Sequence, residues 1–278
     1  MKVGIIGKGF VGNAMYECFK DKFEVEVYDT QEEKRTYNSL ESLVDWADYL
    51  FVCVPTPMNE DGSCDTSIVE SVVELIANLR KDKIVIIKST VPPGTTKRLA
   101  EKHGLQMAFN PEFLTEANSV EDFRYQKMIV VGSDNDDVNT KVWQLYYKFI
   151  TSTGAYMPLM QSCTTTEAEM FKYVANTFLA VKVTFANEIK VLCDRIGVEY
   201  NNVANIAKLD SRLGATHWKV PGPDGKLGYG GSCFPKDTNA LVAFANSVGA
   251  DLWVLTDAMY VNDELRETQY FKKIEVVS

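Results

Sequence analysis

A cysteine in a glycine-rich turn is the residue of this chain best suited to covalent chemistry. Cys233 lies in the stretch Gly228-Tyr-Gly-Gly-Ser-Cys-Phe-Pro-Lys-Asp237, with Lys236 and Asp237 three and four residues further on. A partly exposed thiol beside a lysine, near a helix that the sequence predicts from Asp237 onward, has a lowered pKa and can act as a nucleophile. The alternative is a small apolar side chain in a turn, the usual state of an unmodified cysteine.

Two further groups of polar residues have a spacing that could serve chemistry. Lys172 and Asn176 are four residues apart in a predicted helix and so share one face, although a solvated stripe would look the same. In Asn110-Pro-Glu112, we expect Asn110 to cap a helix, Pro111 to be its first residue and Glu112 to complement the helix dipole.

The N-terminal residues predict a dinucleotide-binding turn. A strand, Lys2–Ile6, leads into Gly7-Lys-Gly9-Phe-Val-Gly12 and a helix to about Phe19. In this context the first glycine makes the tight turn, the second admits a pyrophosphate and the third lets helix and strand meet. Asp29 ends a second strand, Glu24–Tyr28, where a carboxylate accepts the adenosine ribose hydroxyls, which favours NAD over NADP even though Lys34 and Arg35 lie close.

Alternating strands and helices continue and predict a doubly wound, mostly parallel, Rossmann-like α/β sheet that closes near residue 160. Thr90 follows one predicted strand at its carboxyl end, where open α/β sheets place their ligands; a strand-terminating hydroxyl is the alternative. The remaining predicted strands are Tyr49–Val54, Ile84–Lys88, Gln106–Phe109, Lys127–Val131 and Ala155–Leu159. A helix, Ser67–Leu79, is predicted between the first two of them.

The second part, residues 161–278, is predicted to be all-helical around one long helix. Thr164-Thr-Thr-Glu167 is a capping box that opens this helix, and Gly197 follows its expected end at Ile196. About 33 residues at 1.5 Å each make a rod near 50 Å long, which needs a partner along its apolar stripe. We expect that stripe to comprise Phe171, Ala175, Phe178, Leu179 and Val183, and two more helices to run Asp237–Ser247 and Leu252 to about Lys273.

Composition excludes several classes of function. The chain has 278 residues, a net charge of −9 and a 46% hydrophobic content, which argue for a globular protein of two domains and against a nucleic-acid or membrane-surface binder. Its six cysteines lack the spacing of a zinc site or a disulfide framework. With no signal peptide or membrane-spanning run in view, we expect a cytoplasmic protein.

Several of these motifs together resemble the UDP-glucose/GDP-mannose dehydrogenase family. The cysteine motif matches almost letter for letter, Asn110-Pro-Glu-Phe-Leu-Thr-Glu116 resembles its NPEFLxE signature, and Asp210-Ser-Arg212-Leu-Gly214 resembles its D-x-R-I-G. The resemblance implies NAD-dependent, four-electron oxidation of the C6 alcohol of a nucleotide sugar, such as UDP-glucose, to a uronic acid through a thiohemiacetal and a thioester on Cys233.

The resemblance also assigns roles to single residues. Lys172 would stabilise the alkoxide and oxyanion, Asn176 would hold substrate and water, Thr90 would order water, and Glu112 would be the base of hydrolysis, supported by Glu116. Asp237 would complete the catalytic set by positioning water and tuning Cys233, although a cap of the following helix is the alternative. The implied cofactor-binding residues are Gly7, Gly9, Phe10, Val11, Gly12, Asp29, Lys34, Thr90 and Glu116, and the implied substrate-binding residues are Glu112, Phe113, Leu114, Lys172, Asn176, Arg212 and Gly230.

The resemblance also implies a dimer formed through the long helix, in which Arg212 would reach the sugar site of the neighbouring subunit. Family members continue into a third domain where this chain stops. Three explanations stay open: a separate chain supplies that domain, the substrate lacks a nucleotide, or the chain binds NAD without full catalysis. Two other functions also stay open. One is a two-electron β-hydroxyacid dehydrogenase, which has no need of Cys233, and the other is a non-catalytic NAD-binding subunit that completes a partner's site.

Overall fold

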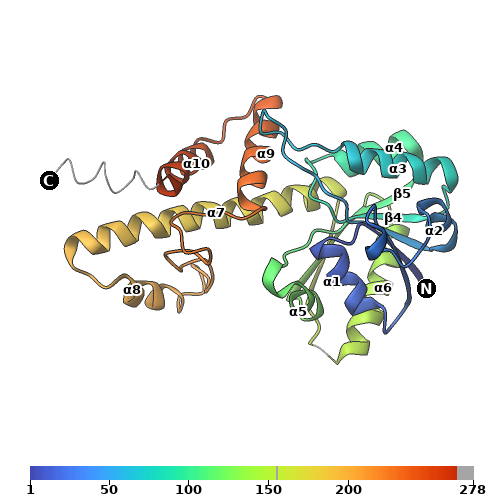
Figure 1. Cartoon of the computed structure of the whole chain (residues 1–278), viewed down its shortest axis with the longest axis horizontal. Coiled ribbons are helices and arrows are strands. Elements are labelled where there is room, and N and C mark those ends of the chain that lie inside the picture. The colour runs from blue at the N-terminus through green and yellow to red at the C-terminus, as the bar shows by residue number, and fades with distance from the viewer. Residues whose placement is uncertain (155, 268–278) are drawn as a thin grey trace. The chain divides into compact units, whose positions relative to one another are not determined.

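The computed structural model describes residues 1–154 and 156–267, apart from the side chain of Glu116. Its contacts divide the chain into two compact units (Figure 1): unit 1 is Met1–Pro57 with Cys64–Lys172, and unit 2 is Met58–Ser63 with the residues from Tyr173 onward. Residues 161–172 therefore belong to unit 1, whereas we expected the first domain to end near residue 160. The assignment of separate functions to the two parts stays a prediction.

Unit 1 contains a seven-stranded sheet in the order β2-β1-β3-β4-β5-β6-β7. The first five strands are parallel, β6 meets β5 in the antiparallel sense at Phe109 and Gly132, and β7 is parallel to β6. This confirms the mostly parallel, doubly wound fold. The strands are β1 (Lys2–Ile6), β2 (Glu24–Tyr28), β3 (Tyr49–Val52), β4 (Ile84–Ile87), β5 (Gln106–Phe109), β6 (Met128–Gly132) and β7 (Leu159–Cys163).

Helices cover both faces of this sheet, because successive side chains of its central strands point to opposite faces and are apolar on each. In β4, for example, Ile84 and Ile86 join one core cluster, and Val85 and Ile87 join the other. The first cluster lies under α1 (Phe10–Phe19), α5 (Ser119–Arg124) and α6 (Asp136–Thr153). The second lies under α2 (Leu40–Trp46), α3 (Ser67–Leu79), α4 (Thr95–His103) and the start of α7 (Thr165–Ile196).

Some predicted boundaries were wrong. β3 ends at Val52 rather than Val54, just before Pro55 and Pro57, which lack the N–H that a strand needs. The last strand was predicted at Ala155–Leu159 but runs Leu159–Cys163 at the sheet edge, where its exposed side chains follow no apolar pattern; Ala155 lies outside the described residues. β4 and β6 differ from prediction by one residue at one or both ends.

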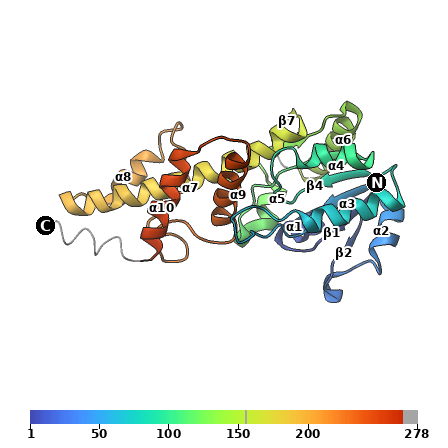
Figure 2. The same ribbon diagram turned by 90° about the horizontal axis from the view of Figure 1, so that it is seen from above.

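Unit 2 is helical and is organised along α7, as predicted. The capping box is confirmed, since the Thr164 N–H donates to Glu167 Oε2 at 2.8 Å and the Glu167 N–H donates to Thr164 Oγ1 at 3.3 Å. Beside α7 lie α8 (Tyr200–Ala207), α9 (Phe234–Ser247) and α10 (Trp253–Arg266), as Figures 1 and 2 show. The predicted continuation of α10 to Lys273 lies outside the described residues. None of the helices in the described ranges combines the length and apolar composition that a membrane crossing requires.

Candidate functional site

The glycine turn after β1 has the geometry of a dinucleotide site. Gly7 has a φ of 94°, and a Cβ there would lie 2.7 Å from the carbonyl oxygen of Cys53. A Cβ on Gly12 would lie 2.0 Å from the carbonyl oxygen of Gly7, so only glycine lets α1 approach the turn so closely. At Gly9, by contrast, a Cβ would have no neighbour within 4 Å, and the space above the turn is open.

The helix that follows presents uncapped N–H groups to that open space. Gly9 is the N-cap of α1 and, like any glycine, has no side chain to cap it, and the half-buried Phe10 and Val11 are the first two helical residues. The N–H groups of a first helical turn lack partners within the helix and favour an anion such as a pyrophosphate. The residues present therefore fit a dinucleotide, with the pyrophosphate at the start of α1.

Asp29, which the sequence predicted to bind the adenosine ribose, directly follows β2. Its carboxylate oxygens accept hydrogen bonds from the backbone N–H groups of Lys8 at 2.6 Å and Gln31 at 2.9 Å. Burial acts to raise the pKa of Asp29, but these N–H groups and the charges of Lys34 and Arg35 hold it below its ordinary value. An ionised carboxylate at this position suits ribose hydroxyls.

The Glu112 turn differs from the prediction. Residues 110–115 are not helical, and Asn110 caps no helix; the next helical turn is η2 (Glu116–Asn118), followed by α5. Asn110 is buried instead, and its side chain forms hydrogen bonds with Lys88, Val130 and Tyr146.

Thr90 is half-buried just after β4, where its carbonyl oxygen accepts from Cys64 Sγ at 3.6 Å. Glu116 begins η2, and its side chain lies outside the described part of the structure.

Glu112 and Lys172 form a buried ion pair in unit 1. Lys172 Nζ lies 2.8 Å from Glu112 Oε1 and 2.6 Å from the Glu112 main-chain oxygen, and both side chains are less than a tenth exposed. The Leu114 N–H donates to Glu112 Oε2 at 2.8 Å, and the Phe113 ring centroid lies 5.3 Å from Lys172 Nζ. The structure thus brings together four residues that were predicted to bind substrate.

The electrostatics of this pair favour a charged Glu112. Burial acts to raise the pKa of Glu112, but the charge and hydrogen bond of Lys172, the Leu114 N–H and the charge of Lys88 lower it below its ordinary value. The carboxylate therefore stays ionised at neutral pH, which is the form that can accept a proton.

In unit 2, Cys233 lies at the start of a helix. It is the half-buried N-cap residue of α9, which begins at Phe234 rather than at Asp237 as predicted. Pro235 in the first turn lacks only an N–H that no helical partner needs, which is why the helix can begin this early. The N-terminus of a helix stabilises negative charge, so a thiolate at Cys233 is in a favourable position.

Asp237 is buried in the first turn of α9, where it bonds to two predicted partners. Its Oδ2 accepts from Asn176 Nδ2 at 2.5 Å, and its Oδ1 accepts from Lys236 Nζ at 2.5 Å. The helix begins before Asp237, so this residue is not the cap that we considered. The sequence suggested that the positive charge of Lys236 would act on the Cys233 thiol. In the structure Lys236 forms an ion pair with Asp237, which offsets that charge.

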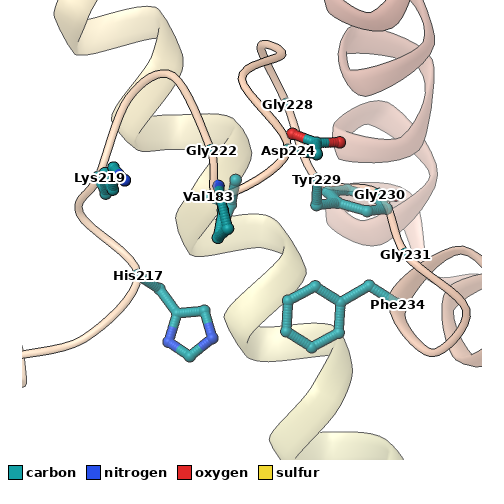
Figure 3. Close-up of a pocket in the computed structure, with 11 residues that line it drawn as sticks. Val183, His217, Lys219, Gly222, Asp224, Gly228, Tyr229, Gly230, Gly231 and Phe234 are labelled. Atoms are coloured by element: carbon teal, nitrogen blue, oxygen red, sulfur yellow. The ribbon is translucent and has the colours of Figure 1, made fainter. Parts of the chain in front are cut away.

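A cavity of about 390 Å³ lies in unit 2 and is lined by residues on both sides of Cys233 in the sequence (Figure 3). The rings of His217 and Phe234 lie next to each other, with centroids 5.7 Å apart and planes tilted by 42°. Burial and the charge of Lys182 lower the pKa of His217, so its ring is neutral at pH 7. Gly230 also lines the cavity. The lining is mostly apolar and contains one cation, Lys219, and one anion, Asp224, so its charges do not favour either sign of ligand.

Arg212 does not line this cavity. Its side chain is 87% exposed and holds both oxygens of Asp210, with the shortest contact at 2.6 Å. The predicted role of Arg212 in a neighbouring subunit stays a prediction.

Comparison with known proteins identifies the family. Residues 29–150 match the NAD binding domain of the UDP-glucose/GDP-mannose dehydrogenase family, and residues 166–264 match its central domain. A UDP-glucose 6-dehydrogenase of Rhizobium meliloti is 33% identical over 319 residues, which cover 99% of this chain and 70% of that protein. The chain belongs to the UDP-glucose/GDP-mannose dehydrogenase family.

Other members of the UDP-glucose/GDP-mannose dehydrogenase family agree with this assignment. A UDP-glucose dehydrogenase structure from Pyrobaculum islandicum has a TM-score of 0.83 and 30% identity over 94% of this chain and 68% of that chain. The UDP-glucose 6-dehydrogenase of Pseudomonas aeruginosa is 34% identical over 298 residues, and the match spans 92% of this chain but only 64% of that relative. The matched NAD binding domain makes NAD the cofactor, as predicted.

Sequence reasoning missed the residues that hold the family's cysteine loop in place. Asn187 Oδ1 accepts from the Gly228 N–H at 3.1 Å, and Asn262 Oδ1 accepts from the Tyr229 N–H at 2.7 Å. Gly228 has a φ of 69°, and a Cβ there would lie 2.5 Å from Asn262 Oδ1, so glycine is needed where the loop packs against α10. Polar residues on amphipathic helices normally face solvent, and no local signal distinguished these from that majority.

Proposed function

We propose that this chain carries the NAD-dependent oxidation of a nucleotide-sugar C6 alcohol, of the UDP-glucose type, to the uronic acid. The observation that best supports the proposal is the state of Cys233: a half-buried thiol at the N-terminus of α9, beside the buried Asn176–Asp237 pair. Family membership and the names of the relatives favour a UDP-glucose-like substrate. NAD, when bound, accepts one hydride in each of two oxidations.

Lys172 would support the first oxidation, in which the alcohol becomes an aldehyde. An ammonium group has three N–H donors, and Glu112 accepts two of them in the described structure. The third is left for the substrate oxygen, whose negative charge grows as the hydroxyl proton leaves. A fixed cation in a site that excludes water stabilises such a charge more than water would.

Cys233 would join the substrate in the second stage. Its sulfur adds to the aldehyde carbon, and the carbonyl oxygen takes a proton to give a thiohemiacetal. Loss of a hydride and of the hydroxyl proton then gives a thioester, with the sulfur still bound to C6. Asp237 is fixed by two hydrogen bonds four residues after Cys233 and would keep Asn176 oriented toward the reacting oxygen.

Glu112 would act in the last stage, the hydrolysis of the thioester. Its ionised carboxylate takes a proton from a water molecule that Thr90 helps to orient, and the water oxygen adds to the carbonyl carbon. The carbon–sulfur bond breaks, the carboxylate product leaves, and the thiolate is restored. Each turnover therefore consumes one water and yields two NADH.

The experiment that tests this function counts electrons. The purified chain is incubated with NAD and a panel of nucleotide sugars, NADH is followed by absorbance, and the product is weighed by mass spectrometry. We expect two NADH per uronic acid, no uronic acid from C233S, and normal stoichiometry from C163S, in which another half-buried cysteine is replaced.

Two outcomes would contradict the proposal. One NADH per substrate, unchanged in C233S, would favour a two-electron dehydrogenase. Binding of NAD without turnover of any sugar in the panel would favour a non-catalytic subunit.

We further propose that α7 forms a homodimer. Its large exposed apolar residues recur at helical spacing along one stripe: Met170, Val174, Phe178, Phe185, Leu192 and Ile196, which we call the α7 stripe. The α7 stripe differs from the stripe expected from the sequence, because Phe178 is the one residue that the two share. Phe171, for example, packs on Phe113 with ring centroids 5.6 Å apart. A stripe of this length is what a second copy of the helix would cover.

A further inference from the structure

Lys88 is a buried lysine to which the proposed reaction gives no role. It directly follows β4, two residues before Thr90, and only 4% of its surface is exposed. Its Nζ donates to Asn110 Oδ1 at 2.8 Å. Among the described residues no carboxylate lies within ion-pairing distance of this ammonium group, although a buried lysine is normally paired.

The contact with Asn110 connects Lys88 to the turn that carries Glu112. Asn110 Oδ1 also accepts from the Tyr146 hydroxyl at 2.5 Å, and Asn110 Nδ2 donates to the Val130 carbonyl oxygen at 2.6 Å. Asn110 is only 2% exposed, so these bonds fix the start of a turn that no helix stabilises. Two residues later, Glu112 is therefore held where Lys172 can reach it.

The groups that face Lys88 leave Glu112 as the one anion near it in the described structure. Burial raises the pKa of the Cys53 thiol to about 12 and raises the pKa of Tyr146 as well, so both are neutral at pH 7. Phe123 contributes a ring face 5.8 Å from Nζ, and Lys172 contributes a second positive charge. The charges of Lys88 and Glu112 act on each other in both directions.

We propose that Lys88 is a positioning residue for Glu112: its ammonium group holds Asn110 and the turn behind it, and its charge helps to keep the Glu112 carboxylate ionised. The inference rests on the proposed role of Glu112 as the base of thioester hydrolysis. Two cations around one buried carboxylate would keep Glu112 charged even when Lys172 turns toward a substrate oxygen.

A purely structural role would not need the charge. Burial lowers the pKa of Lys88 to about 8, which means that the fold bears a cost for keeping the ammonium group there. Lys83 is a natural comparison, because it is also buried and lies just before the other end of β4. Its Nζ donates to the Asp45 carbonyl oxygen at 3.1 Å, far along the strand from Glu112.

The direct test is a titration of Glu112 in the full chain. Protein labelled with ¹³C at the glutamate carboxyl carbons is followed by NMR against pH, and E112Q identifies the signal. We expect the Glu112 midpoint to move to higher pH in K88M and in K88Q, which keeps a donor for Asn110 without the charge. In K83M the midpoint should stay where it is in the parent protein. If K88M does not fold, K88Q carries the test.

An unchanged midpoint in the Lys88 variants, or an equal shift in K83M, would overturn the proposal. Activity gives a second measure: the acid limb of the pH profile for uronic acid formation should move to higher pH in K88Q, with kcat reduced roughly tenfold and KM for NAD unchanged. K88R, which keeps the charge, should restore the acid limb. If the parent protein makes no uronic acid, the proposed function fails, while the titration still tests Lys88.

Discussion

Replacing Lys172 by methionine tests the buried ion pair at the centre of unit 1. Methionine fills the volume of the lysine stem but leaves Glu112 with the Leu114 N–H as its remaining hydrogen-bond donor among the described contacts. The variant therefore isolates the charge and the two hydrogen bonds of the ammonium group. We expect a large loss of stability as well as a loss of activity.

The size of the loss follows from burial. The side chains of Lys172 and Glu112 are 4% and 8% exposed, and removing one partner of a buried pair costs about 3–5 kcal/mol. K141M is the matched control, because Lys141 pairs with Asp137 four residues earlier on a helix of the same unit, with 42% and 64% exposure. That pair is screened by solvent, and its loss costs about 0.3–0.5 kcal/mol.

The pH dependence of K172M has a definite sign. In the parent protein the pKa of Glu112 is lowered, so its stabilising contribution is present above the unfolded pKa and is lost as pH falls through the folded one. In K172M, burial is no longer opposed by Lys172, and the pKa of Glu112 rises. The deficit of the variant should therefore be larger at pH 8 than at pH 5, where Glu112 can take up a proton.

The assay is urea unfolding of the parent, K172M, K141M and the double variant K172M/E112Q at both pH values. In the double variant the unpaired charge of Glu112 is removed as well. This should restore about 2 kcal/mol of the lost stability, since the two residues are in contact. The reasoning is refuted if K172M is no less stable than K141M, or if its deficit is the same at pH 5 and pH 8.

Two other predictions follow from buried and exposed groups on α7. Glu169 is fully buried and accepts from the Gly94 and Thr96 N–H groups at 2.6 and 2.7 Å, and burial raises its pKa to about 7. The contribution of Glu169 to stability is fully present below its unfolded pKa and is lost as pH rises through about 7. In urea unfolding, the stability of the parent relative to E169Q should therefore fall by about 3 kcal/mol between pH 4 and pH 8. Replacing Phe178 and Phe185 by aspartate should convert the proposed dimer to a monomer in light scattering, and a parent protein that is already monomeric would contradict the role given to the α7 stripe.

The sheet and the glycine turn were predictable because their signals are local or are spread over whole strands. Ile84–Ile87 is buried on both faces, so its run of apolar residues indicates a central parallel strand without reference to any neighbour. Gly7 and Gly12 mark the turn because no other residue fits the backbone there. The edge strand β7 lacked such a pattern, and its prediction was wrong by four residues.

The Asn110 turn shows why the candidate site was harder to predict. Asn-Pro-Glu has the residues of a helix start, and a capped helix was the simplest local account. The structure instead uses the Asn110 side chain to connect Lys88, Tyr146 and the main chain of β6, which are separated from it by 20 to 36 residues. A buried amide gains more from these contacts than an exposed cap would provide, because each unpaired buried polar group is costly. Lys88 was missed for the same reason. A lysine at the end of an apolar strand is ordinarily solvated, and only the hydrogen bond to Asn110 distinguishes Lys88 from such a residue.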